Sequence, residues 1–265
     1  MDSAQTMAYF FDNIDVFLLI IVRLLGFFII LPVLSGSNIP LMVRTLLAMS
    51  MAYIIFSSTL VIHVHYYPTI LGFGMLAAGE FITGFLMAYV VYIVFSVLFL
   101  VGQMIDMQIG FSMVSVLDPI TQIQVPIAGN LLFMTMGVML VQSGGLHSFI
   151  SALFFSYDVM PIGHTVIINN ASIINSLLLL MADYFVMGVQ IAMPIVGSLL
   201  ILTIALGILV KSVPQMNIFV VGIPIKLLLG LIIFFFIIPV FSQVYDELFA
   251  KATRALINMI RNLSS

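Results

Sequence analysis

Six long apolar stretches, separated by short polar turns, dominate the pattern of hydrophobic and polar positions along this 265-residue chain. A membrane-spanning helix needs about 20 apolar residues, so each stretch is long enough to cross a bilayer. The third and fifth are much longer, and each is either one long helix that leaves the bilayer or a bent pair, with Pro194 and Gly197 marking a kink in the fifth. The stretches cover residues 14–34, 43–62, 70–101, 127–155, 173–210 and 216–244.

The pattern changes after the sixth stretch. Between residues 245 and 263, apolar side chains recur at helical spacing while charged side chains fall largely on the opposite face. This predicts an amphipathic helix that lies on a membrane surface or docks on a partner. Lys251, Arg254 and Arg261 indicate a cytoplasmic C-terminus, whereas the acidic N-terminus favours the other side of the membrane. Opposite sides require an odd number of spans, so some stretches must be re-entrant or held inside an assembly.

Composition supports membrane integration and excludes several kinds of chemistry. The chain is 63% hydrophobic and 6% charged, whereas a soluble domain carries about 25% charged residues. No polar linker divides it, so one membrane-embedded body is expected. The absence of cysteine excludes disulfides and thiolate metal sites. The sequence contains no nucleotide-binding or catalytic motif, so neither an enzyme, a cofactor nor a metal is predicted. A net charge of −3 gives no indication of nucleic-acid binding.

Residues 102–126 interrupt the apolar pattern with a polar, weakly acidic segment. Asp118–Pro119 and Pro126 disfavour helix at the residues before each proline, and Gly110 weakens the middle. Non-helical backbone at membrane depth persists where it is buried in protein or lines a watery cavity. The segment is therefore either a long external loop or a re-entrant segment in a conduit. Its small and compressible side chains suit an apolar constriction that closes a pore.

Charged residues also occur within or beside the apolar stretches. A charge at the bilayer centre costs about 2.5–3.5 kcal/mol even on the lenient insertion scale, so these residues are not expected to face lipid. Three interpretations remain open: snorkelling at helix ends, a buried ionic network that fixes helix register or lines a path, and a proton relay. The residues are Arg23, Arg44, Glu80, Asp183 and Lys226.

Taken in order, several short motifs resemble the FliR/SctT family of export-gate proteins in flagellar and injectisome type III secretion. The resemblance covers nearly the whole chain and is strongest between Leu206 and Lys226, although Lys211 stands where the family usually has arginine. The other matching positions are Arg23, Gly26, Leu31, Pro32, Ile39, Pro40, Arg44, Gly79, Glu80, Gly84, Gly102, Gln103, Gln108, Ile109, Gly110, Asp118, Pro119, Pro126, Gly144, Gly145, Leu146, His147, Pro161, Ile162 and Gly163.

The resemblance implies a non-enzymatic subunit of the flagellar export gate in the bacterial inner (cytoplasmic) membrane, at the flagellar basal body. Such a subunit forms and plugs the entry pore through which unfolded flagellar substrates are exported. The implied fold is an all-α integral membrane protein, with long, kinked and re-entrant hairpins packed in a helical hetero-oligomer. Residues 1–185 would form a P-like front part, and residues 186–265 a Q-like hairpin with a basic amphipathic tail.

The resemblance also implies partners and sites. One copy would assemble with P-type and Q-type subunits and work with the large export-gate subunit, the cytoplasmic ATPase system, unfolded substrates and lipid. The charges Arg23, Arg44, Glu80, Asp183, Lys211 and Lys226 would contact neighbouring subunits. The pore plug would comprise Asp106, Gly110, Phe111, Ser112, Met113, Val114, Ser115, Val116, Asp118 and Pro119. The alternatives are an injectisome subunit, a stand-alone secondary transporter of a small solute, and a purely structural membrane scaffold.

Overall fold

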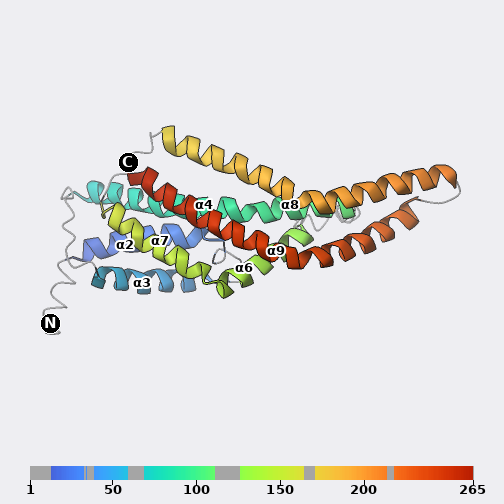
Figure 1. Ribbon diagram of the computed structural model, residues 1–265. Coiled ribbons are helices and arrows are strands. Elements are labelled where there is room, and N and C mark those ends of the chain that lie inside the picture. The colour runs from blue at the N-terminus through green and yellow to red at the C-terminus, as the bar shows by residue number, and fades with distance from the viewer. Residues whose placement is uncertain are drawn as a thin grey trace. The chain divides into compact units, whose positions relative to one another are not determined.

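Helices form every regular element that the computed structural model describes, and this confirms the expected all-α integral membrane class (Figure 1). The structure describes residues 13–32, 34, 39–58, 69–110, 126–163, 171–213 and 218–264. Its helices are α2 (Ile14–Ile30), α3 (Leu41–Ser58), α4 (Ile70–Ile109), α6 (Ile127–Gln142), α7 (Gly145–Val159), α8 (Ala171–Ser212) and α9 (Ile218–Ser264).

The long third and fifth apolar stretches each form one continuous helix. α4 has 40 residues, which makes it about 60 Å long, twice the thickness of a bilayer's hydrocarbon core. α8 has 42 residues and continues through Pro194, where the Ser198 hydroxyl donates to the Pro194 carbonyl at 2.5 Å. Within the described residues, α4 and α8 are long and apolar enough to cross a membrane, and four spans result if the bent pair α6–α7 and the two parts of α9 each count as one.

The chain folds into two compact units. Unit 1 combines Met1–Ile93, Gly144–Leu179 and Lys251–Ser265, and unit 2 combines Val94–Ser143 and Leu180–Ala250. Three helices, α4, α8 and α9, therefore contribute residues to both units. Unit 1 also contains α2, α3 and α7, whereas unit 2 also contains α6.

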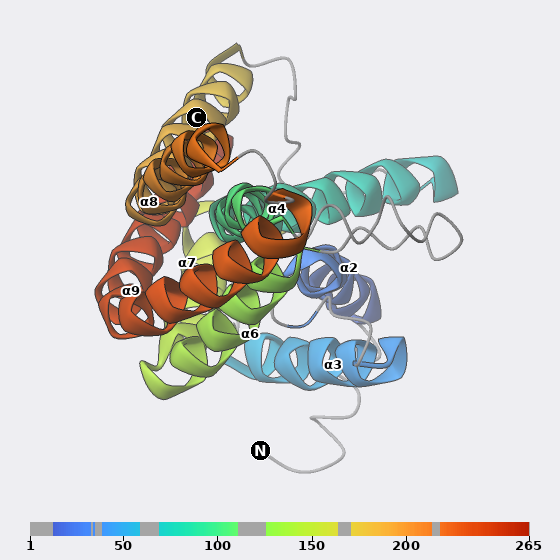
Figure 2. The same ribbon diagram turned by 90° about the vertical axis from the view of Figure 1, so that its right-hand side faces the viewer.

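In unit 1, α2 and α3 lie side by side (Figure 2). The ring of Phe17 on α2 meets that of Phe56 on α3 edge to face, with 5.7 Å between centroids. The small residues Ala48 and Ala52 are fully buried on α3, as expected where helices pack closely in a membrane protein. The outward face of α3 carries large exposed apolar side chains such as Met42 and Leu46.

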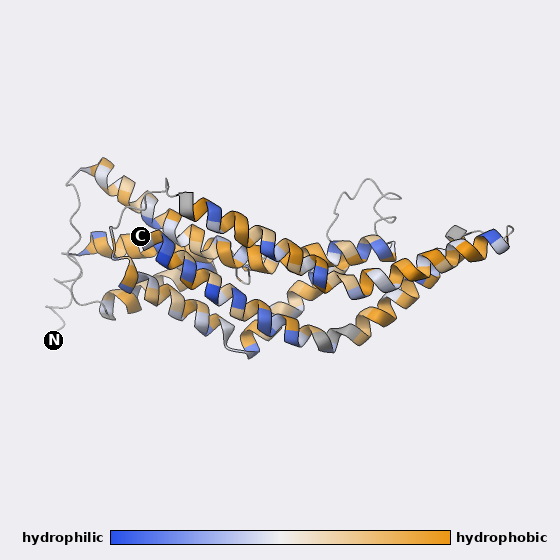
Figure 3. Cartoon of the chain, turned by 45° about the horizontal axis from the view of Figure 1, so that its top comes forward, coloured by the Kyte–Doolittle hydropathy of each residue, from blue (hydrophilic) through white to orange (hydrophobic). Residues whose placement is uncertain are grey.

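The amphipathic tail predicted from the sequence lies in the second part of α9, Phe241–Ser264, after a 65° bend in this helix. Its hydrophilic positions recur along the helix near the C-terminus (Figure 3). Its apolar face is not free for a membrane or a partner, because these side chains are buried within the protein itself. The buried residues are Tyr245, Leu248 and Phe249 in unit 2, and Ala252, Leu256, Met259, Ile260 and Leu263 in unit 1.

Candidate functional site

The end of α4 and the start of α6 meet where the predicted plug segment leaves and rejoins the helices. We call this junction the root and define it as Gly102, Asp106, Ala128 and Gly129, all of which belong to unit 2. Asp106 is 6% exposed. Both of its carboxylate oxygens accept from the Ala128 backbone N–H, at 3.2 and 3.3 Å.

This contact satisfies a need that α6 cannot meet itself. The first N–H groups of a helix have no partner inside the helix, and a side-chain oxygen normally caps them. The residue before α6 is Pro126, and no side-chain cap is made there. A carboxylate from α4 supplies the acceptor instead, and its negative charge is favourable at a helix N-terminus.

The two helices also touch through their backbones. A Cβ atom added at Gly102 would overlap with the backbone of Gly129, so α4 and α6 cross with no space between them. Beyond this crossing, α4 ends at Ile109, and Gly110 follows with φ +98°, a left-handed conformation that favours glycine. The Gly110 N–H donates to the Asp106 carbonyl at 3.0 Å, so one residue closes the helix with its backbone and holds α6 with its side chain.

In the structure, the non-helical interruption begins later in the chain than the sequence predicted. Residues 102–109, which the sequence placed in the non-helical segment, form the last two turns of α4. The residues that disfavour helix, Gly110 and the two prolines, all lie beyond this part, and Gly102 within it is the residue at which α6 approaches most closely. Asp106 is therefore a helix residue and Gly110 follows the helix end. The other predicted plug residues lie outside the described residues: Phe111, Ser112, Met113, Val114, Ser115, Val116, Asp118 and Pro119.

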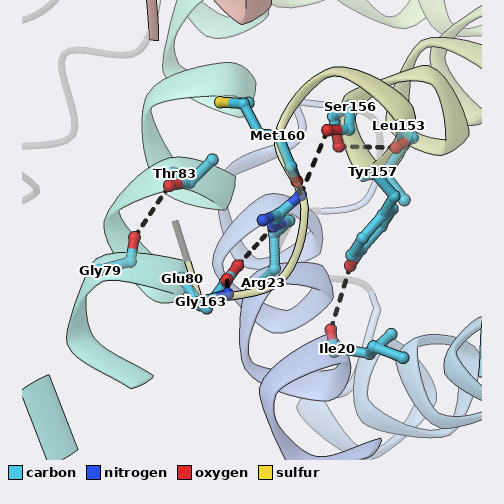
Figure 4. Close-up of polar contacts among 10 residues, drawn as sticks. All are labelled: Ile20, Arg23, Gly79, Glu80, Thr83, Leu153, Ser156, Tyr157, Met160 and Gly163. Carbon is cyan, nitrogen blue, oxygen red and sulfur yellow. Dashed lines mark hydrogen bonds and ion pairs between the residues drawn. The ribbon is translucent and has the colours of Figure 1, made fainter. Parts of the chain in front are cut away.

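A second polar site lies in unit 1, where Arg23 of α2 and Glu80 of α4 form a buried ion pair (Figure 4). The distance from Arg23 Nε to Glu80 Oε2 is 2.5 Å, and each side chain is 1% exposed. The other oxygen of Glu80 accepts from the Gly163 N–H at 2.8 Å. Gly163 has φ +86° and follows α7, so Glu80 fixes the turn at the end of that helix.

Arg23 binds the same helix end from its other side. Its Nη1 donates to the carbonyls of Ser156 at 3.4 Å and Met160 at 3.1 Å. The Ser156 carbonyl also accepts from the Met160 N–H at 2.8 Å, and carbonyls at the end of a helix favour a nearby cation. Arg23 Cζ also lies 4.3 Å from the ring centroid of Tyr157, whose hydroxyl donates to the Ile20 carbonyl at 3.3 Å. Three helices are thereby joined through one arginine.

The sequence singled out both charges of this cluster, but it gave no sign of Tyr157 and noted Gly163 only as a position that matches the family. Tyr157 and Gly163 carry no charge, and a tyrosine in an apolar helix has no distinguishing pattern. The spacing of 57 residues between Arg23 and Glu80 gave no sign that they pair. Both oxygens of Glu80 are occupied by described donors, so the geometry fits a helix-joining network rather than a relay that must exchange protons with solvent.

The remaining predicted charges lie apart from this cluster. Arg44 is half-buried, and its Nη2 donates to the Ile39 carbonyl at 3.1 Å. Asp183 on α8 and Lys211 at its end are exposed, and Lys226 on α9 is half-buried. Among the described residues, these last three make no ion pair. The part of the chain that the structure describes also contains no group of three potential metal ligands.

Comparison with known proteins adds an independent result. The chain is 26% identical over 255 residues to the flagellar biosynthetic protein FliR of Bacillus subtilis (strain 168), covering 94% of this chain and 96% of that protein. It is 26% identical over 244 residues to the protein of the same name in Escherichia coli (strain K12), covering 92% of each. The surface presentation of antigens protein SpaR of Shigella flexneri is 27% identical over 234 residues, covering 85% of this chain and 87% of that protein. The model of bacterial export proteins, family 1, matches residues 14–252, and the chain therefore belongs to this family of bacterial export proteins.

Proposed function

We propose that the protein is a subunit of the flagellar type III export gate in the bacterial inner membrane. It forms and plugs the entry pore through which unfolded flagellar substrates leave the cytoplasm. The plug comprises the segment from Gly110 to Pro119, and Asp106 anchors it. Membership of a bacterial export family and similarity to FliR proteins along most of the chain support the flagellar apparatus.

The observation that carries the plug proposal is the root. α4 is a helix of span length and composition, and its last turns are fixed to the start of α6 by a buried carboxylate and a backbone contact. Between these fixed ends the sequence changes from apolar to polar and glycine-containing. A polar, glycine-containing segment whose two ends join packed helices is suited to closing a passage that must later admit a chain.

Deletion of residues 110–116 tests the plug. We expect cells that express the assembled complex with this deletion to show an inner-membrane ion leak that the intact complex lacks, because the constriction is gone. The leak is measured as collapse of the membrane potential, and the amount of assembled complex is measured in parallel. A tight membrane with normal assembly would assign the pore closure to partner subunits and leave this segment a structural loop.

The surface of α8 supports assembly with other subunits. In the apolar 18-residue part of α8 that could cross a membrane, 17% of the residues are buried within the chain, whereas in the corresponding part of α4 61% are buried. The exposed carboxylate of Asp183 interrupts this bare surface, and a charge facing lipid is costly. We propose that Asp183, together with Lys211 and Lys226, contacts neighbouring P-type and Q-type subunits. The same proposal divides the chain into a P-like part (about 1–185) and a Q-like hairpin with its tail (about 186–265). It also places the C-terminus in the cytoplasm, where it faces the large export-gate subunit and the ATPase system.

An Asp183→Leu variant tests this contact. We expect about tenfold less of the partner subunits to co-purify with it from solubilised membranes, because a hydrogen bond to a charged group contributes about 1.5–3 kcal/mol. The matched control is Asp158→Leu, which removes an exposed carboxylate from α7. Equal recovery of partners with both variants would remove Asp183 from the interface.

Two further experiments separate the alternatives. A stand-alone transporter would move its solute as a single purified chain in vesicles, whereas an export-gate subunit would be inactive without its partners. The similarity to SpaR leaves an injectisome role as the second candidate. Loss of motility on deleting the gene, with unchanged secretion by any injectisome, would favour the flagellar role.

A further inference from the structure

We infer that Asp106 is a positioning residue that holds α4 and α6 together at the root, so that the two helices stay joined while a substrate passes. This inference rests on the proposed function and concerns how the gate is regulated. It predicts that opening does not separate the two helices at the root.

The first support is the isolation of the Asp106 contact from water. The carboxylate is 6% exposed and accepts from the N–H of Ala128, which is itself buried. If the helices separated, the N–H would lose its acceptor in surroundings where water does not readily replace it. The contact therefore opposes separation more strongly than a surface hydrogen bond would.

The second support is the close packing of α4 against α6. At Gly102 and Gly129 the backbones are in contact, and Phe99 of α4 stacks on Phe133 of α6 with 4.9 Å between ring centroids. These contacts extend the junction along α6 away from the root. Small residues that allow such close approach are a main source of helix association in membranes.

The third support comes from α9, which braces α4 at the same level. A Cβ atom added at Gly230 would lie 2.6 Å from the Ile109 side chain, so Ile109 fills the notch that this glycine leaves on α9. Ile109 is 3% exposed. The next residue, Gly110, would meet nothing within 4 Å if it carried a Cβ. The braced part of α4 therefore ends between Ile109 and Gly110.

Reversible cross-linking tests whether the root opens. The chain has no cysteine, so a Phe99→Cys, Phe133→Cys variant carries the sole pair of thiols in this subunit. A short thiol-specific linker, cleavable by reductant, would join α4 to α6 in cells with the complete export apparatus. We expect linked and reduced complexes to export flagellar protein into the medium at the same rate. Export that stops on linking and resumes on reduction would overturn the inference.

Substitution of Asp106 tests its positioning role separately. Asp106→Leu removes the acceptor, and we expect an ion leak about tenfold above that of an Asp246→Leu control, since an unpaired buried N–H is costly. Asp106→Asn keeps an acceptor oxygen and is expected to stay tight. Asp246 is an exposed carboxylate on α9 in the same unit. An Asp106→Leu complex that assembles normally and stays tight would contradict the role, and if this variant fails to assemble, the cross-linking result decides.

The two proposals fail in different ways. If deletion of residues 110–116 produces no leak, the plug function fails whatever Asp106 does. If the deletion leaks while Asp106→Leu stays tight, the plug remains and the positioning role is lost.

Discussion

A Glu80→Ala variant is expected to leave almost no folded protein in the membrane. The substitution strips Arg23 of its counter-charge in a site where each side chain is 1% exposed, and it leaves the Gly163 N–H without its acceptor. Breaking a buried ion pair costs about 3–5 kcal/mol, a large share of the roughly 5–15 kcal/mol that stabilises a typical folded protein. The amount of protein in purified membranes and the midpoint of thermal unfolding in detergent measure the effect.

A double variant separates loss of the pair from loss of the fold. In Arg23→Met, Glu80→Met, neither charge remains, and apolar side chains of similar length fill the space, which often restores most of the stability. We expect it to be recovered in larger amounts than Glu80→Ala. An Asp246→Ala variant, which removes an exposed carboxylate, should match the unmodified protein. If Glu80→Ala were as stable as Asp246→Ala, the cluster would not be what joins α2, α4 and α7.

Two glycines five residues apart on α4 should respond to alanine in opposite directions. A Cβ atom at Gly84 would overlap with the Arg23 carbonyl on α2, whereas one at Gly79 meets nothing within 4 Å. Gly84→Ala forces the two helices apart, and we expect it to lower the free energy of unfolding by about 3 kcal/mol. Gly79→Ala removes a poor helix former and should raise it by up to about 1 kcal/mol. Thermal unfolding of the purified variants gives both values.

Unit 2 provides an independent repeat of this comparison. Gly102 faces the backbone of Gly129, whereas Gly137 on α6 has open space where a Cβ would lie. Gly102→Ala should therefore destabilise the protein and Gly137→Ala should not. Shifts of the same sign within either pair would show that helix propensity, rather than close packing, determines the outcome.

The sequence was informative wherever a signal depends on local periodicity. Apolar runs predicted the helical membrane class, and the small residues Ala48 and Ala52 do lie on a buried face. The sequence left the structure open where tertiary packing determines the course of a helix. Pro194 left open whether the fifth stretch is one helix or a bent pair, and α8 continues through it as one helix, because a proline removes only one helical hydrogen bond and the helix on either side can remain intact.

The candidate sites show the same division. Charges in apolar surroundings stood out, so Arg23 and Glu80 were found without a structure, whereas Asp106 was singled out as part of the polar interruption and by the resemblance. Their partners were not predictable, because Tyr157 and Gly163 are separated from Arg23 and Glu80 by many residues. Tyr157 contacts Arg23 through the face of its ring, and Gly163 contacts Glu80 through a backbone N–H. The amphipathic tail was correctly placed, but nothing in its sequence revealed that its own chain covers the apolar face.

Unit 1 combines segments from the beginning, the middle and the end of the chain, and this has a consequence for biosynthesis. Its helices α2 and α3 emerge early from the ribosome, whereas Lys251–Ser265, which belong to the same unit, follow much later. Asn262 in this late segment donates to the Ser176 hydroxyl of α8 at 3.0 Å. At about 5–20 residues per second, translation takes roughly ten to forty seconds to pass from α3 to the tail. During that interval the early helices of unit 1 exist without the last segment of their own unit, so unit 1 reaches its final packing only when the end of the chain has been synthesised.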